Sequence, residues 1–176
     1  MELGMTIPLQ KFIKASAPPY GIEDNVLFCW EVHVVEVLES QRLFIVNAQN
    51  RFTVVLGNMA PGEWQNLTAV VSSGIETALR DIGAGDRAVS NYFNQAGPAL
   101  WTKTHGRSPV AGLNHMVKHY LWRPLSLVTE KQFQREQSRW LNRMPFKYFD
   151  YRGTEELMWE ALELEFNKEI HIEFDF

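Results

Sequence analysis

The sequence contains one cysteine, Cys29, and no long hydrophobic run. One thiol cannot close a disulfide within the chain, so a disulfide-stabilised scaffold is excluded. No segment approaches the ~20 apolar residues that a transmembrane helix needs. The first five residues include an acid and do not lead into a signal-peptide core. Internal repeats and low-complexity tracts are also missing. We therefore expect a cytoplasmic protein with no membrane partner.

The composition is that of an ordinary globular protein. Of the 176 residues, 45% are hydrophobic and 22% are charged. A chain of this length buries about 70% of the surface that its unfolded form exposes, so a hydrophobic core alone can hold it folded. We expect a single domain over residues 1–176.

Charges of opposite sign are separated along the chain, although the net charge is only −4. Residues 103–152 carry ten Lys and Arg against three Asp and Glu, a net charge of +7. Residues 153–176 carry one Lys against eight acids, a net charge of −7. The basic segment indicates either a surface for nucleic acid or another polyanion, or a face that the acidic segment neutralises.

Hydrophobic periodicity predicts an α+β fold built on an antiparallel sheet. Segments 27–38, 43–46 and 52–56 indicate three strands joined by short turns, which form an antiparallel meander. Residues 170–176 alternate perfectly and predict a C-terminal strand in the same sheet. Short strands are expected at 3–7 and 99–102. Helices that pack on the sheet are expected at 8–15, 61–82, 86–93, 108–123, 129–143 and 154–165.

Capping residues predict where several helices begin and end. We expect Asp86, Ser108 and Thr154 as N-caps, because short polar side chains satisfy the free N–H groups of a first helical turn. Thr129-x-x-Gln132 has the pattern of a capping box. Gly83 is expected in the left-handed conformation just after a helix.

The polar loop 103–108 leads from a predicted strand into the start of a predicted helix. Lys103 and Arg107 would add positive charge to the helix N-terminus, which favours a phosphate or another anion. The loop lacks the glycine spacing of a P-loop, so nucleotide hydrolysis is not expected. The alternative is structural: Ser108 caps the helix, and Arg107 pairs with a carboxylate or a carbonyl.

Several short motifs occur in a recognisable order. They are Trp30, the apolar strand 43–46 ending in Asn47, Lys103-Thr104-x-x-Arg107-Ser108, and Asn114 downstream. Over about residues 3–122 this pattern resembles a family of small bacterial proteins with no assigned activity. The sequence departs from the family at Val46-Asn47, where Thr-Asn is common, and at His105-Gly106, where polar pairs are common.

The resemblance implies one polar cluster rather than an activity. Its members would be Asn47, Lys103, Thr104, Arg107, Ser108 and Asn114. Such a cluster is either a binding site for an anion or a buried hydrogen-bond network, and the resemblance does not decide between them.

Three further features of the sequence carry groups capable of chemistry. His115 and His119 lie four residues apart on a predicted helix and could hold zinc, but no third ligand and no adjacent Glu accompany them, so we predict no metal and no cofactor. His33 could serve as a base if it faces the Lys103 loop, and otherwise is a covered histidine. Cys29, within an apolar run, is expected to be a buried hydrophobe rather than a nucleophile.

A basic stripe recurs every fourth residue in the predicted helix 129–143. Its members are Lys131, Arg135, Arg139 and Arg143. At this spacing the four side chains span about 120° of the helix, which suits a nucleic-acid backbone or a protein partner. The alternatives are solvation, or pairing with Glu156, Glu160 and Glu163 of the last helix.

Three functional hypotheses follow. The first is a non-enzymatic binding module for a protein or nucleic-acid partner. The second is a nucleic-acid-acting enzyme with a phosphate site at Lys103 and Arg107 and a histidine as base. The third is a structural or accessory protein with one protein partner. The charge separation favours the first, because no coherent catalytic set accompanies it.

Overall fold

The computed structural model describes residues 1–166, which form an α+β fold around a five-stranded sheet. The strands are β1 (Glu2–Met5), β2 (Cys29–Val37), β3 (Ser40–Asn47), β4 (Thr53–Leu56) and β5 (Leu100–Lys103). Their order across the sheet is β4-β3-β2-β1-β5. The helices are α1 (Ile7–Phe12), α2 (Pro61–Gln65), α3 (Leu67–Asp81), α4 (Asp86–Ala96), α5 (Arg107–Trp122), α6 (Arg135–Asn142) and α7 (Thr154–Phe166).

The sheet is mixed, so the prediction of a purely antiparallel sheet is wrong. The predicted meander is confirmed, since β2, β3 and β4 pair in antiparallel order. β1, however, pairs in parallel with both β2 and β5. Parallel neighbours need long crossover connections, and these leave no hairpin signal in the sequence. The predicted strand 170–176 lies outside the described residues.

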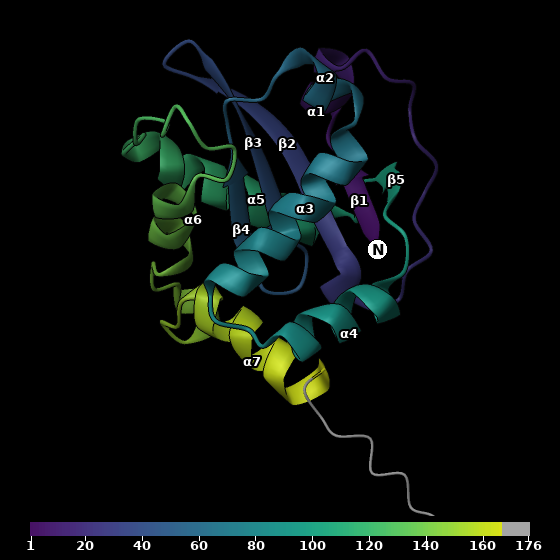
Figure 1. Ribbon diagram of the computed structural model, residues 1–176, viewed down its shortest axis with the longest axis vertical. Coiled ribbons are helices and arrows are strands. Elements are labelled where there is room, and N and C mark those ends of the chain that lie inside the picture. Colours follow the sequence, from purple (N-terminus) through teal and green to yellow (C-terminus); the bar gives the residue numbers. More distant parts are fainter. Residues whose placement is uncertain (167–176) are drawn as a thin grey trace, which may run out of the picture.

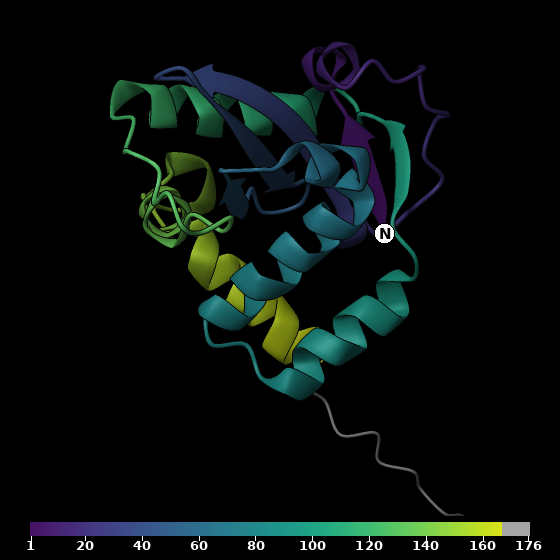
Figure 2. The ribbon, with the colours of Figure 1, turned by 45° about the horizontal axis from the view of Figure 1, so that its top comes forward.

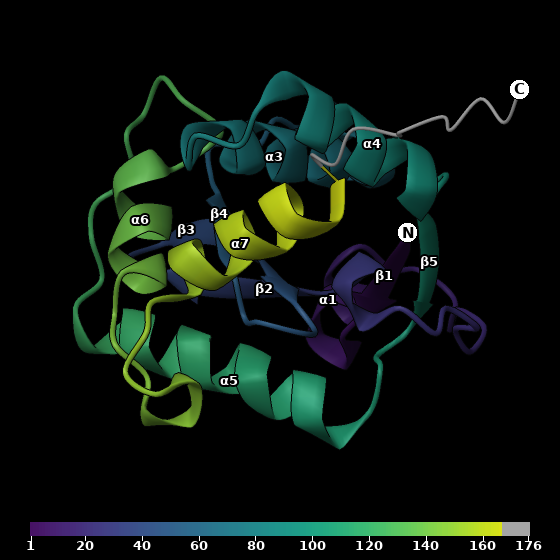
Figure 3. The ribbon, with the colours of Figure 1, turned by 90° about the horizontal axis from the view of Figure 1, so that it is seen from below.

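Helices cover both faces of the sheet, as the view from below shows (Figure 3). α3, α4 and α7 lie on one face, and α5 lies on the other (Figures 1 and 2). Because successive side chains of a strand point to opposite faces of the sheet, each strand contributes residues to both cores. Trp30, Ile45 and Val54 belong to the core under α3, whereas Phe44 and Val55 belong to the core under α5.

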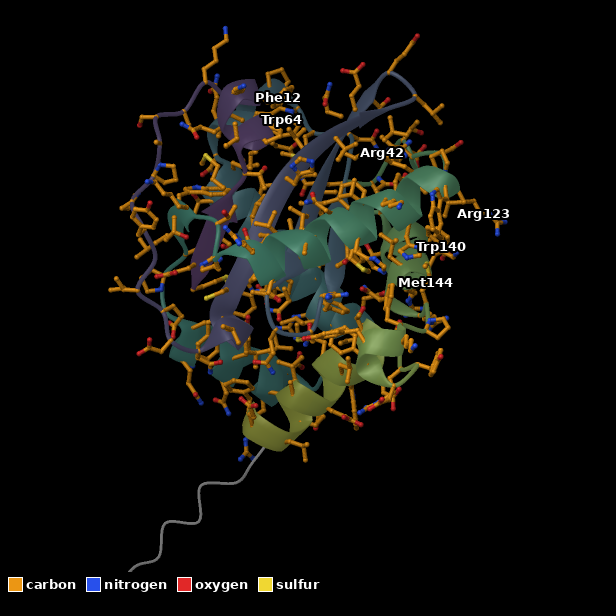
Figure 4. The ribbon with its side chains drawn as sticks, turned by 180° about the vertical axis from the view of Figure 1, so that it is seen from behind. Phe12, Arg42, Trp64, Arg123, Trp140 and Met144 are labelled. Carbon is orange, nitrogen blue, oxygen red and sulfur yellow. The ribbon has the colours of Figure 1, made fainter. Side chains whose placement is uncertain are left out.

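Buried polar pairs fix how the helices sit on the sheet. On one face the indole of Trp30 donates to the Tyr92 hydroxyl of α4 at 2.9 Å, and that hydroxyl donates to the Leu27 carbonyl at 2.9 Å. On the other face the buried guanidinium of Arg42 donates to the Tyr120 hydroxyl of α5. Figure 4 shows Arg42 beside α5, and Phe12 of α1 against Trp64 of α2.

Several helices begin elsewhere than the capping residues predict. The predicted helix 61–82 is two helices, α2 and α3, which meet at Asn66. Gly85 rather than Asp86 is the N-cap of α4, and Gly106 rather than Ser108 is the N-cap of α5. Gly83 has φ +85°, so its predicted left-handed conformation is confirmed.

The last two helices are joined by a buried hydrogen bond. α6 begins at Arg135, six residues after Thr129, so the predicted capping box does not form and Lys131 precedes the helix. The hydroxyl of Thr154 donates to Oδ1 of Asn142 in α6 at 2.9 Å. The Thr154 side chain thus links α7 to α6. In the part of the chain described here, no helix is long and apolar enough to span a membrane.

Candidate functional site

The parallel strands β1 and β5 end side by side next to the start of α5. Met5, the last residue of β1, is paired with Lys103, the last residue of β5. The carboxyl ends of parallel strands commonly frame ligand sites in sheets covered by helices, because loops and helix N-termini converge there. In this protein a pocket opens at that place.

The pocket, which we call the Lys103 pocket, has a volume of about 520 Å³. Three residues predicted for the polar cluster line it: Lys103, Thr104 and Asn114. Thr6, Gln10 and His33 add polar groups, and the remaining lining residues are apolar: Met5, Ile7, Pro8, Ala17, Pro18, Val110 and Leu113. The loop after α1 forms one wall through Ala17 and Pro18 and contributes no acidic residue to it.

His33 lies in the same pocket, as the hypothesis of a base near Lys103 requires. Burial lowers the pKa of His33, so its imidazole is neutral at neutral pH. The Thr6 hydroxyl donates to the Val32 carbonyl at 3.0 Å and lies 3.0 Å from Nδ1 of His33. Since that hydroxyl has only one proton, Nδ1–H donates to it, and Nε2 keeps its lone pair.

Lys103 is held near the mouth of the pocket by the loop that precedes β2. Its backbone N–H donates to the Pro19 carbonyl at 2.7 Å, and its Nζ lies 3.9 Å from the centre of the Tyr20 ring. Tyr20 is 77% exposed. An exposed cation–π contact of this kind contributes only about 0.5–1 kcal/mol, so the ammonium can turn toward an anion.

The other predicted cluster residues do not line the pocket. Arg107 and Ser108 are exposed on the first turn of α5. Asn47 is buried on β3, three strands away from β5, and its amide donates to the carbonyls of Leu27 and Cys29 at 2.9 and 3.4 Å. Asn47 therefore binds backbone carbonyls far from the other five residues, so the prediction of one six-residue cluster is wrong for Asn47, whereas anion binding at Arg107 and Ser108 stays a prediction.

Next to the pocket, on the sheet face that α5 covers, lies a buried group that the sequence did not reveal. We call Glu2, Cys29, Glu31 and His105 the His105 cluster. Nε2 of His105 lies 3.0 Å from Oε2 of Glu2, and Nδ1 lies 2.9 Å from Oε1 of Glu31. The side chains of these three residues are 11%, 7% and 0% exposed.

The two carboxylates of this cluster have different hydrogen-bond partners. Oε1 of Glu2 accepts the backbone N–H groups of Ile22 and Glu23 at 2.6 and 2.9 Å. Oε1 of Glu31 accepts the backbone N–H of His105 at 2.7 Å as well as its ring. Oε2 of Glu31 is buried and has no hydrogen-bond partner among the described residues.

The electrostatics of the cluster follow from these contacts. Burial opposes ionisation of both Glu2 and His105. Hydrogen bonds from the backbone of Ile22 and Glu23 and from His105 outweigh it and lower the pKa of Glu2. At His105 the contacts of the ring with Cys29 and Glu31 outweigh burial, and the pKa of the ring rises to about 10. A sequence signal did exist: Glu2 is the one charged residue of β1, and Glu31 stands among apolar residues at the start of β2.

The predicted basic stripe is largely paired within the chain. Asp81 at the end of α3 binds Nε of Arg135 at 2.5 Å and Nε of Arg139 at 2.8 Å. Arg143 pairs with Glu155 at 3.1 Å. Lys131 lies outside α6, so the predicted four-residue helical stripe is wrong in extent. The partners are Asp81 and Glu155 rather than Glu156, Glu160 and Glu163.

A second cavity, of about 460 Å³, lies between α6 and α7. Its lining includes Arg143 and Glu155, which bind each other, and Glu156, which binds Arg152 at 3.0 Å. The charges of its walls are thus already neutralised, and the Lys103 pocket is the better candidate for a charged ligand.

His115 and His119 form a pair on α5, with their Nε2 atoms 3.0 Å apart. Burial lowers the pKa of both rings, and the positive charge of Lys118 lowers them further. Among residues 1–166, the one group of three or more possible metal ligands is Glu2, Cys29 and His105, so the histidine pair has no third ligand there.

Fold and site together define a helix-covered mixed sheet with a pocket at the ends of its parallel strands. A family model described as a domain of unknown function, DUF6933, matches residues 2–156, so the chain belongs to that family. The expected membership of a family without an assigned activity is confirmed. Neither the curated proteins nor the solved structures that were compared with the chain include a match.

Proposed function

We propose that the protein is a binding module whose Lys103 pocket takes a small organic anion with an apolar body. The observation that carries this proposal is the pocket itself, about 520 Å³ in volume, with Lys103 among polar groups and apolar walls. Pockets for small molecules commonly measure 300–1,000 Å³, roughly, and combine apolar walls with a few polar groups that orient the ligand.

The charge of the pocket supports an anion. Lys103 is a cation, His33 is neutral because burial lowers its pKa, and the described lining contains no Asp or Glu. The 16-residue helix α5 begins beside the pocket, and its N-cap, Gly106, makes no side-chain cap. The positive end of that helix therefore adds to the field of Lys103.

The polar groups are suited to a carboxylate or a phosphate ester. Lys103, Thr104 and Asn114 can donate to its oxygens, and Nε2 of His33 can accept from a hydroxyl or amine elsewhere on the ligand. The apolar walls favour a hydrocarbon or aromatic body over a free inorganic ion.

A pair of fluorescent probes tests this proposal. Anilinonaphthalene sulfonate and phenylnaphthylamine share their aromatic rings, but only the first has an anionic group. We expect the folded protein to bind the sulfonate about tenfold more tightly or better, since a hydrogen bond to a charged group is worth roughly 1.5–3 kcal/mol. Lys103→Met should abolish this preference and leave binding of the neutral probe unchanged.

Lys118→Met is the matched control, because Lys118 lies on α5 outside the lining. It should keep the preference for the sulfonate. Equal affinity for the two probes in the wild-type protein, or a preference that survives Lys103→Met, would contradict the proposal. Near-UV circular dichroism of each variant shows whether its tertiary packing is intact, so it separates binding in the pocket from probe binding to a loosened, molten-globule-like state.

A catalytic use of the same pocket is the second candidate, favoured by the neutral His33 beside Lys103. A base with a free lone pair next to a cation can remove a proton from a bound substrate. Turnover of nucleic acid or a phosphate ester that is lost in His33→Gln, while the sulfonate probe still binds, would favour the enzyme over the binding module.

A further inference from the structure

We propose that the His105 cluster is a zinc site in which Glu2, Cys29 and His105 supply ligands and Glu31 orients the imidazole. A carboxylate oxygen, the thiol sulfur and a ring nitrogen of the three ligand residues lie within 4.8 Å of one another. All three side chains project from the carboxylate-bearing face of β1 and β2 or from the loop after β5. This site is separate from the Lys103 pocket, and neither proposal depends on the other.

Glu31 is the independent reason to expect a cation. Its side chain is 0% exposed, and Oε2 has no hydrogen-bond partner in the described chain. A Cβ atom built on Gly4 would stand 2.4 Å from this oxygen and 3.0 Å from Nδ1 of His105. The free oxygen therefore lies over Gly4 and away from solvent, on the side of the sheet where the ring of His105 also lies.

Zinc binding at this cluster has a definite proton balance. Nε2 of His105 and the thiol of Cys29 must each give up a proton to solvent before they can ligate the dication. The two protons leave as the two positive charges of zinc enter, so the net charge of the cluster does not change. The case for a cation therefore rests on the donor set and on the unpartnered Oε2 of Glu31.

The donor set and its second shell fit zinc in particular. Zinc takes Cys, His and carboxylate ligands at about 2.0–2.3 Å, which sets ligand atoms about 3.3–3.8 Å apart. Nε2 of His105 and Oε2 of Glu2 are 3.0 Å apart, so the side chains need to open only slightly. Meanwhile Nδ1 of His105 donates to Glu31 at 2.9 Å, the carboxylate–histidine arrangement that orients metal-bound imidazoles.

Such a site would join segments that are distant in sequence. It would connect β1 and the start of β2 to the loop between β5 and α5, which also carries Thr104 of the Lys103 pocket. Zinc bound at this place would hold the pocket wall in position without touching its ligand.

Zinc and cobalt salts are the probes for the test, on the full chain without a histidine tag. After treatment with a chelator and dialysis against zinc, we expect one retained zinc per chain. X-ray absorption of that sample should show one sulfur neighbour at about 2.3 Å. Because Cys29 is the single cysteine of the chain, a sulfur ligand assigns the site. No retained zinc, or zinc bound without sulfur, overturns the proposal.

Variants separate the ligands from the orienting residue. The cobalt-loaded wild-type protein should show a sulfur-to-cobalt charge-transfer band, and Cys29→Ser should lose it. Glu31→Gln should keep the band but weaken zinc binding about 10- to 100-fold. The double variant His115→Gln/His119→Gln is the control and should bind zinc as the wild type does. If Cys29→Ser does not fold, X-ray absorption of the wild-type protein still shows whether sulfur is a ligand of the zinc.

Discussion

The carboxylate of Glu31 lies over Gly4, its partner in the parallel register of β1 and β2. A Cβ atom on Gly4 would stand only 2.4 Å from Oε2 of Glu31. Because the Glu31 side chain is fully buried, the carboxylate cannot swing aside into solvent. Gly4 is therefore required where it stands, although its backbone is that of an ordinary strand.

Gly4→Ala should therefore destabilise the protein by about 1–3 kcal/mol, the usual cost of an extra methyl group in a packed site. Urea unfolding measures the change. Gly62→Ala is the control, because a Cβ there meets nothing within 4 Å and Gly62 lies in the helix α2. We expect that substitution to be neutral or stabilising. Equal effects of the two substitutions would argue against the crowding over Gly4.

The outer edge of β4 is closed by side chains of α6. Oδ1 of Asn142 accepts the Thr53 N–H at 2.7 Å, and Nδ2 of Asn142 donates to the Thr53 carbonyl at 2.8 Å. Oγ of Ser138 accepts the Val55 N–H at 3.0 Å. These side chains take the place of a neighbouring strand and protect an edge that would otherwise be open to other chains.

Asn142→Leu keeps the side-chain size but leaves the backbone of Thr53 and the hydroxyl of Thr154 unpaired. We expect a loss of at least about 2 kcal/mol, since each buried group without a partner costs roughly 1–3 kcal/mol. Denaturant unfolding measures the loss, and light scattering should report aggregation through the open edge. Asn94→Leu, on an exposed position of α4, is the control. A loss below that of the control would mean that the edge does not need Asn142.

The histidine pair on α5 should make stability depend on pH. Burial, followed by nearby positive charges, lowers the pKa of His115 and His119 below 6.5 in the folded state. As the pH falls, the unfolded chain therefore binds protons at a higher pH than the folded chain does. The contribution of the two histidines to the stability of the fold is complete above pH 6.5 and is lost as the pH falls through their pKa values in the folded state.

The test is an NMR titration of the imidazole protons together with unfolding at several pH values. Both rings should titrate below 6.5. His119→Gln should lose less stability than the wild type between neutral and mildly acidic pH. A midpoint at or above 6.5 for both rings would show that neither burial nor Lys118 controls them.

The nucleic-acid hypothesis has a sharp test in Asp81, which holds both Arg135 and Arg139. Because their charges are paired, we expect the wild-type protein to bind a labelled duplex only weakly at moderate salt. Asp81→Asn removes the negative charge that neutralises both guanidinium groups, so it should strengthen binding and make the slope of log K against log salt steeper by about one to two.

Asp86→Asn removes the same charge from an exposed position that pairs with Arg80, and it serves as the control. Fluorescence anisotropy over a salt series gives both affinities and slopes. If the wild-type protein binds the duplex tightly and with a steep salt dependence, α6 is a nucleic-acid-binding surface in spite of its ion pairs.

Local patterns in the sequence were enough for the meander, and the polar loop together with the family resemblance was enough for part of the pocket. β2, β3 and β4 follow the two-residue alternation and short turns, which act between neighbours in the chain. Lys103, Thr104 and Asn114 come together because a strand, a loop and the first turns of one helix place them so. Burial of Cys29 in its apolar run was also predicted and is confirmed.

Helix starts were harder to predict from capping residues. Glycines rather than Asp86 or Ser108 precede α4 and α5, and the Asp86 carboxylate pairs with Arg80 instead. Local propensity is a weak guide to the exact first residue of a helix.

Only the tertiary structure decided the position of β1. By itself the sequence determined the composition of a globular protein, a three-stranded meander and a polar loop before α5. It could not determine that β1 lies in parallel between β2 and β5, because that pairing joins residues 2–5 to residues 29–32 and 100–103. Pairing over such separations depends on how the helices bury their apolar faces on the sheet, and no local pattern records it. That one strand brings Glu2 to Cys29, Glu31 and His105, and it closes the Lys103 pocket beside them.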